Sequence, residues 1–228
     1  MTALGDARLE SLLARLHARS GAQDEALARY FGRRAQEGSL DWRALDADAN
    51  RFLADKMVAL EPDKALFCHR LCRALRAKRV VEVGTSFGVS TLYLAAAVRD
   101  QAARDGAPGV VIATEAEPAK AAAARAHFAE AGLAEWIDLR EGDLRETLRR
   151  IEGPVDFVLM DVWTELARPA LELVAPHLRS GAIVIADNTV QFRDAYADYL
   201  AFVNDPANGL RTQTLPFAGG LEMTVRCG

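Results

Sequence analysis

The amino-acid sequence predicts an α/β protein built on a doubly wound, mostly parallel sheet. Short apolar runs rich in β-branched residues, typical of buried parallel strands, alternate with longer segments of helical periodicity. Glycine or polar residues separate them where a strand turns toward a helix. Because such alternation builds crossover units, we expect parallel strands with helices on both faces of the sheet.

Length and composition limit the classes of function. The chain has 228 residues, enough for one α/β domain with a helical extension. Lys and Arg number 28 and Asp and Glu 32, a net charge of −4, and no basic tract predicts nucleic-acid binding. No apolar run predicts a membrane span and the start lacks an apolar signal core, so we expect a cytoplasmic protein. The three cysteines fit a reducing compartment, and Cys68 and Cys72, one helical turn apart, are expected on a buried helix face rather than as a metal pair.

Residues 1–54 are predicted to form a helical extension, and 55–228 the main domain. Leucines between residues 9 and 16 recur at helical spacing, and a second helical pattern covers 26–35. The aromatic and aliphatic residues that follow are too few for a core of their own. We therefore expect the extension to pack on the main domain, on a second subunit or over a substrate site.

The first predicted strand covers residues 79–83 and follows a helix that begins at Pro62. The pattern Glu82-x-Gly84-x-x-x-Gly88 then leads into an apolar helix. It lacks the middle glycine that lets the backbone approach a pyrophosphate in the dinucleotide fingerprint. The pattern favours a nucleoside ligand without a diphosphate over a nicotinamide cofactor, although a simple packing turn would show the same glycines.

The second predicted strand, 110–114, ends at Glu115. Nucleoside-binding α/β domains hold the ribose hydroxyls with a carboxylate at this position. A helix at 119–131 and a third strand at 136–139 follow. Asp143 either caps a helix at 144–150 or contacts an adenine ring.

The fourth and fifth predicted strands, 155–160 and 182–186, end at Asp161 and at Asp187-Asn188. Because the carboxyl ends of parallel strands share one edge, these side chains would supply three hard oxygen ligands of the kind Mg²⁺ prefers. Capping of a loop is the alternative for Asp187 and Asn188. A helix at 194–203 and strands at 211–215 and 221–226 complete the chain, and the four histidines fall in predicted helices, as surface or packing residues.

Several stretches taken in order resemble the cation-dependent O-methyltransferases of the catechol O-methyltransferase type: EVGTSFGVSTLYLA, the acid Glu115, VDFVLMDVW and GAIVIADN. The resemblance runs from about Asp55 to the C-terminus. It implies a seven-stranded sheet with the last strand antiparallel, S-adenosylmethionine and Mg²⁺ or another divalent cation as cofactors, and a homodimer. The implied acceptor is a small molecule with a hydroxyl group, catechol-like or phenolic.

The resemblance also implies roles for residues. Those expected at the cofactor are Glu82, Gly84 and Ser90 around its methionine part, Glu115 at the ribose, Asp143 and Trp163 at the adenine, and also Thr85, Ser86 and Asp161. The expected metal ligands are Asp161, Asp187 and Asn188. Glu222 falls where the family has an acid near the substrate hydroxyl.

One position departs from the family, which usually has a lysine base directly after the tryptophan of the fourth-strand motif. This chain has Thr164 there. Three explanations stay open: the cation alone lowers the hydroxyl pKa enough, Glu222 or Lys56 acts as the base, or the protein catalyses slowly or not at all. The corresponding alternative functions are a methyltransferase with another acceptor or without a metal, and a non-catalytic cofactor-binding or dimerisation module.

Overall fold

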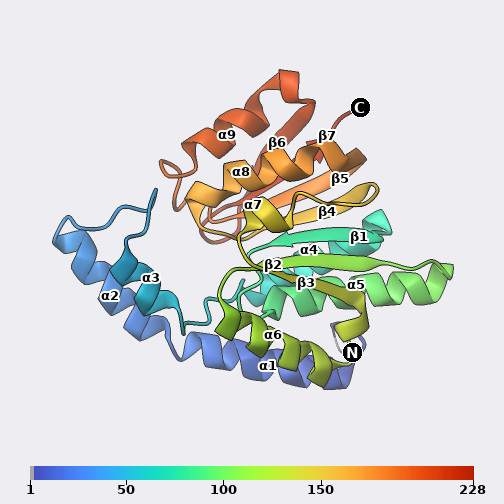
Figure 1. Cartoon of the computed structure of the whole chain (residues 1–228), viewed down its shortest axis with the longest axis horizontal. Coiled ribbons are helices and arrows are strands. Elements are labelled where there is room, and N and C mark those ends of the chain that lie inside the picture. The colour runs from blue at the N-terminus through green and yellow to red at the C-terminus, as the bar shows by residue number, and fades with distance from the viewer. Residues whose placement is uncertain (1–2) are drawn as a thin grey trace.

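The computed structural model describes residues 3–228, so the first two residues of the predicted extension lie outside the described part. Within it, seven strands form one sheet in the order β3-β2-β1-β4-β5-β7-β6 (Figure 1). All neighbouring pairs up to β5 are parallel, and β7 is antiparallel to β5 and β6. The predicted fold class, including the antiparallel last strand, is confirmed. The strands are β1 Arg79–Val83, β2 Val110–Glu115, β3 Ile137–Glu141, β4 Val155–Met160, β5 Leu178–Asp187, β6 Leu210–Leu215 and β7 Leu221–Arg226.

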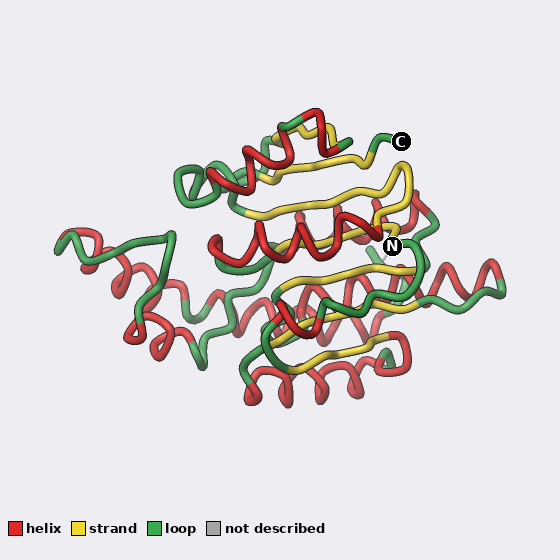
Figure 2. The backbone as a smooth tube through the Cα atoms, turned by 45° about the horizontal axis from the view of Figure 1, so that its top comes forward, coloured by secondary structure: helices red, strands yellow, loops and turns green. Residues whose placement is uncertain are grey.

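Helices cover both faces of the sheet, as Figure 2 shows. Successive residues of a strand face opposite sides, so Val80 packs in the core on one face while Val81 and Val83 pack in the core on the other. The first core holds side chains of α1, α4, α5 and α6, and the second those of α7, α8 and α9. The helices are α1 Ala7–Gly21, α2 Asp24–Gln36, α3 Ala47–Leu53, α4 Pro62–Leu75, α5 Val89–Asp105, α6 Pro118–Ala131, α7 Leu144–Thr147, α8 Thr164–Val174 and α9 Ala197–Asn204. None of these helices is long and apolar enough to cross a membrane.

Some boundaries differ from those predicted. The fifth strand was predicted to begin at residue 182, after the turn expected at Gly181, yet β5 already begins at Leu178. Gly181 has φ +75° inside the strand, and the register with β4 shifts there, so the glycine forms a bulge rather than a turn. The helix that Asp143 caps ends at Thr147 instead of residue 150.

The N-terminal extension divides into two parts. Helix α1 buries four leucines in the core that α5 and α6 share. Residues 24–53, comprising α2, the loop 37–46 and α3, project beyond the sheet, and we call this segment the arm (Figure 1, left). Inside the arm, the rings of Tyr30 and Phe52 stack at 3.8 Å between centroids, and buried Arg34 pairs with Asp46, which caps α3.

Candidate functional site

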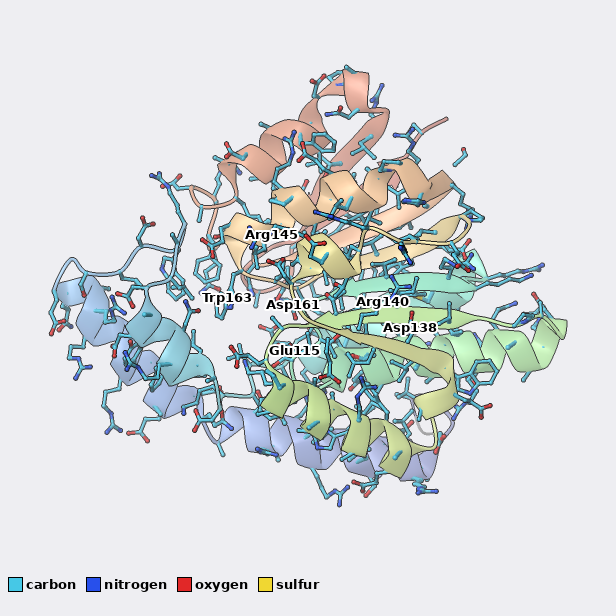
Figure 3. All side chains as sticks on the ribbon, viewed as in Figure 1. Glu115, Asp138, Arg140, Arg145, Asp161 and Trp163 are labelled. Atoms are coloured by element: carbon cyan, nitrogen blue, oxygen red, sulfur yellow. The ribbon has the colours of Figure 1, made fainter. Side chains whose placement is uncertain are left out.

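A cavity of about 720 Å³ lies beyond the carboxyl ends of β1, β2, β4 and β5, and the arm forms one of its walls. Most of the predicted site residues line it: Gly84, Thr85, Ser86, Ser90, Glu115, Asp143, Asp161, Trp163, Thr164, Asp187 and Asn188. Figure 3 shows Glu115, Asp161 and Trp163 around the space between the sheet and the arm. Glu82 and Glu222 do not line the cavity. The volume is that of a site for a small-molecule ligand.

The turn after β1 needs its first glycine because another backbone crosses close to it. Gly84 has φ +93°, and a Cβ built on it would lie 2.0 Å from the carbonyl oxygen of Asp161. The amide of Asp161 donates to the carbonyl of Val83 at 3.0 Å. The end of β4 is therefore held against the glycine turn, which brings Asp161 to the cavity.

Glu115, at the end of β2, is bound to the same turn. Its carboxylate accepts the backbone N–H of Ser86 at 2.6 Å and that of Glu117 at 2.8 Å. Ser86 adopts a left-handed φ of +49°, and its N–H points to Glu115 at the end of β2. Glu115 is only partly exposed and lines the cavity, as expected for a residue that binds hydroxyl groups of a ligand.

Glu82 does not join the cavity wall, in contrast to the expectation. It lies on the strand face that packs against α5, where its Oε2 accepts hydrogen bonds from Thr85 and Thr91. The side chain is fully buried, and its Oε1 has no hydrogen-bond partner among the described residues. Burial raises the pKa of Glu82 to about 7. Glu82 thus lies beneath the turn, a position from which it supports Thr85.

Asp143 caps α7, the first of the two roles considered for it. Its side chain accepts the N–H of Arg145 at 2.9 Å and pairs with the Arg145 guanidinium. That ion pair lowers the pKa of Asp143 to about 2. Both side chains line the cavity, so the cap leaves room for a ligand contact, and the adenine contact stays a prediction.

Asp161 and Asp187 meet at the cavity beside a lysine that the sequence analysis did not single out. The ammonium of Lys64 lies 2.7 Å from Asp187 Oδ1 and 2.9 Å from Glu61 Oε2, and the lysine is fully buried. Burial raises the pKa of Asp161 well above its ordinary value, and that of Asp187 to about 6. The sequence contained a pattern that could have predicted the burial of Lys64. The lysine shares a helix face with Cys68 and Cys72, which are both buried.

The three residues predicted as metal ligands carry oxygen atoms of the kind that a hard divalent cation takes, and their use as ligands stays a prediction. Within residues 3–228, no three His, Cys, Asp or Glu side chains are grouped to hold a metal, so the set consists of two carboxylates and the amide of Asn188. Asn188 has φ +58° and donates from Nδ2 to Asp187 Oδ2 at 2.7 Å. Asp161 faces the cavity, and the charge of Asp187 further raises its pKa. A cation between the two carboxylates would relieve this repulsion.

Glu222, the acid predicted near a substrate hydroxyl, does not line the cavity. It is buried on β7 and accepts hydrogen bonds from Thr212 and from Thr214 (2.6 Å) of β6. It lies on the face opposite to Leu221 and Met223, which pack in the first core.

The position where the family has its lysine base contacts the arm instead. The Thr164 hydroxyl donates to the backbone carbonyl of Trp42. Lys56, the other candidate base, does line the cavity, and its ammonium pairs with Asp55 and lies 4.8 Å from the ring centroid of Phe52.

Part of the aromatic wall opposite the sheet was not predicted from the sequence. Trp42 lies with its ring centroid 4.6 Å from that of Phe192 and 4.8 Å from that of Phe31, and all three line the cavity. Phe31 and Phe192 were not predicted to lie at the site. Their sequence positions are far apart, and only the folded arm brings them together.

Comparison with protein families and sequences agrees with the predicted resemblance. Residues 81–189 match the model of a family described as a methyltransferase domain. The chain is 30% identical over 135 residues to a catechol O-methyltransferase of Mycobacterium tuberculosis, covering 59% of this chain and 58% of that protein. It is 28% identical over 142 residues to a catechol O-methyltransferase of Niastella koreensis, covering 59% of each. The chain thus aligns with less than two thirds of these relatives.

Solved structures share the fold. An O-methyltransferase of Bacillus cereus in complex with SAH has a TM-score of 0.66 at 21% identity, with 78% of this chain and 87% of that chain covered. A structure from Klebsiella pneumoniae described as a putative O-methyltransferase has a TM-score of 0.70 at 20% identity, with 98% and 91% covered. The TomG O-methyltransferase of Streptomyces achromogenes, in complex with SAM, has a TM-score of 0.66 at 22% identity, covering 80% and 87%. At these identities the likeness establishes the fold of the chain.

Proposed function

We propose that this chain, which resembles catechol O-methyltransferases through its central segment, is an S-adenosylmethionine-dependent O-methyltransferase. The acceptor we propose is a hydroxyl group of a small catechol-like or phenolic molecule, and a divalent cation assists. One observation carries the proposal: the turn after β1 and Glu115 line the same cavity as Asp161, Asp187 and Asn188. A nucleoside-binding wall and a set of hard oxygen ligands thus meet in one space.

The cofactor would occupy the side of the cavity formed by the ends of β1, β2 and β3. There the turn at Thr85 and Ser86 and the carboxylate of Glu115 face the cavity, with Asp143 and Trp163 further along. Glu115 already accepts two backbone N–H groups, which fix its orientation for ribose hydroxyls. The N-terminus of α5 follows the turn, and its positive end suits the carboxylate of the methionine part.

Asp161, Asp187 and Asn188 would hold the cation. A bound divalent cation lowers the pKa of a coordinated hydroxyl, which makes the oxygen a better nucleophile toward a methyl group. The residues around these ligands contribute orientation, because Lys64 holds one oxygen of Asp187 and the backbone of β1 holds Asp161. Holding the acceptor close to the methyl donor then supplies most of the remaining acceleration.

The structure favours one of the three explanations for the missing lysine. Thr164 donates its hydroxyl proton to the Trp42 carbonyl, and Glu222 lies outside the cavity wall. Lys56 is the candidate base that lines the cavity, but its ammonium is paired with Asp55. We therefore propose that the cation alone activates the hydroxyl, with Lys56 as the alternative base.

A second function is favoured by Lys64. Its buried ammonium already supplies a positive charge to Asp187. A methyltransferase-like protein that binds the cofactor but uses no divalent cation, or transfers no methyl group, would also keep this ion pair.

Calorimetric titration with S-adenosylhomocysteine tests the cofactor part of the proposal. We expect saturable binding at a 1:1 ratio in the wild type. Replacement of Glu115 by Ala should weaken binding by at least about tenfold, because two ribose hydrogen bonds are lost. Glu152→Ala is the control, since Glu152 is exposed and does not line the cavity. The absence of binding by the wild type would refute the proposal, and equal affinity in Glu115→Ala would refute the placement of the ribose.

A further inference from the structure

We propose that Thr164 is a positioning residue that selects the methyl acceptor by fixing Trp42 as a wall of the cavity. The inference rests on the proposed function and specifies it further. The preferred acceptor is a flat single aromatic ring that fits between the arm and the acid pair. Thr164 thereby has a role in this chain other than that of a base.

The contact that carries the inference joins distant parts of the chain. Thr164 is the first residue of α8, and its hydroxyl reaches the carbonyl of Trp42, 122 positions earlier. Within residues 3–228 it is the one side-chain hydrogen bond between the arm and the main domain. The other polar side-chain contacts of the arm, such as Arg34 with Ser39 and Asp46, lie inside the arm.

The hydrogen bond places an aromatic surface over the cavity. With its carbonyl held, Trp42 packs its ring against Phe192 of the main domain and Phe31 of the arm. Trp163, immediately before Thr164, lines the same cavity and is 38% exposed. Aromatic walls bind flat rings through offset or edge-to-face contacts, so the spacing between Trp42 and the sheet decides which rings fit.

Loss of the hydrogen bond should weaken binding of the acceptor and leave binding of the cofactor unchanged. The arm would keep its internal contacts, but Trp42 would no longer be held at one distance from the acid pair. KM for ring-shaped acceptors should rise, because the aromatic wall contributes to their binding. Glu115 accepts the N–H groups of Ser86 and Glu117, whereas Thr164 donates to Trp42 of the arm, so affinity for S-adenosylhomocysteine should not change.

Three variants test this role. Thr164→Val keeps the shape of the side chain and removes the donor, whereas Thr164→Ser keeps the donor. Tyr30→Phe is the matched control, because its hydroxyl donates to Asp48 (2.8 Å) within the arm. The measurements are kcat and KM for one-ring and two-ring catechols with Mg²⁺, and calorimetric affinity for S-adenosylhomocysteine.

We expect Thr164→Val to raise KM for the one-ring acceptor roughly five- to tenfold, the ratio that one ordinary hydrogen bond gives. Its kcat and its affinity for S-adenosylhomocysteine should stay within about twofold. Thr164→Ser and Tyr30→Phe should behave like the wild type. An unchanged KM in Thr164→Val, or a Thr164→Ser variant as impaired as Thr164→Val, would overturn the inference.

A second readout does not depend on turnover. The chain has three tryptophans, so Trp136→Phe with Trp163→Phe leaves Trp42 as the single fluorophore. In that background Thr164→Val should make Trp42 clearly more accessible to acrylamide, and Thr164→Ser should not. Equal quenching in the single-tryptophan protein and its two Thr164 variants would refute the claim that Thr164 fixes the position of Trp42. Lack of turnover by the wild type on every acceptor would instead refute the proposed function, and with it the selective role.

Discussion

Lys64 is the residue on which the charge balance of the candidate site depends. Asp161, Asp187 and Glu61 bring three carboxylates close together, and Lys64 supplies one ammonium. A buried carboxylate without a partner is costly, and a lone pair of acids in one cavity repels. The lysine offsets part of that repulsion, and the proposed divalent cation would offset more of it.

The burial of Glu82 predicts that the stability of the folded protein depends on pH. Its pKa is about 7 in the folded protein because it is fully buried, and an exposed glutamate has an ordinary value near 4.5. Since the folded pKa is the higher one, the protonated form is favoured in the folded state. That contribution is complete below about pH 4.5 and is lost as pH rises through 7, a change of about 3 kcal/mol.

Replacement of Glu82 by Gln should remove this dependence, since the amide resembles the protonated acid. The stability of the variant relative to the wild type should rise by about 3 kcal/mol between pH 4.5 and 8. Urea denaturation of both proteins across this range measures the difference. A difference in unfolding free energy that stays constant with pH would show that Glu82 is ionised at the same pH in the folded and unfolded chain.

The element that organises the site is the turn after β1, together with the ends of β2 and β4 packed against it. Gly84 is required there on two grounds, a positive φ and the carbonyl of Asp161 2.0 Å from any added Cβ. The turn, Glu115 and Asp161 are thus held together by hydrogen bonds to the backbone.

Replacement of Gly84 by Ala should therefore lower the unfolding free energy by about 3 kcal/mol or more, since the clash is with backbone. Gly106→Ala is the matched control. Its φ is +67°, but a Cβ there meets nothing within 4 Å, so only the backbone strain of about 1 kcal/mol applies. Thermal and urea denaturation of both variants give the comparison. Equal losses of stability in the two variants would contradict the close contact between the turn and β4.

The sequence predicted the strands and the polar side chains at their ends because both depend on short-range patterns. Val80 to Val83, Asp161 and Asp187 can be identified from apolar runs and the residues that end them. Contacts such as Lys64 with Asp187 and Thr164 with Trp42 join residues more than 120 positions apart, and no local pattern encodes them. The hydrogen bonds of Glu222 with Thr212 and Thr214 likewise depend on the pairing of β7 with β6, which no local pattern specifies.

At the scale of the whole molecule, the cavity lies between the ends of the strands and the arm. The arm adds the aromatic side chains of Phe31 and Trp42 to its lining. Packing on the main domain, one of the three roles expected for the extension, is what α1 does. The homodimer implied by the resemblance stays a prediction.

The central claim is that one cavity joins a methyl donor, a hydroxyl acceptor and a divalent cation held by Asp161, Asp187 and Asn188. Methyl transfer from S-adenosylmethionine to catechol, measured with Mg²⁺ and with EDTA, tests it most directly. Asp187→Ala serves as the site variant, and Asp194→Ala, an exposed acid in the segment that follows, serves as the control. We predict turnover with Mg²⁺ in the wild type and in the control, its loss in EDTA, and a loss of at least about a hundredfold in Asp187→Ala. Turnover that neither EDTA nor Asp187→Ala reduces would contradict the account and show that methyl transfer proceeds without a cation.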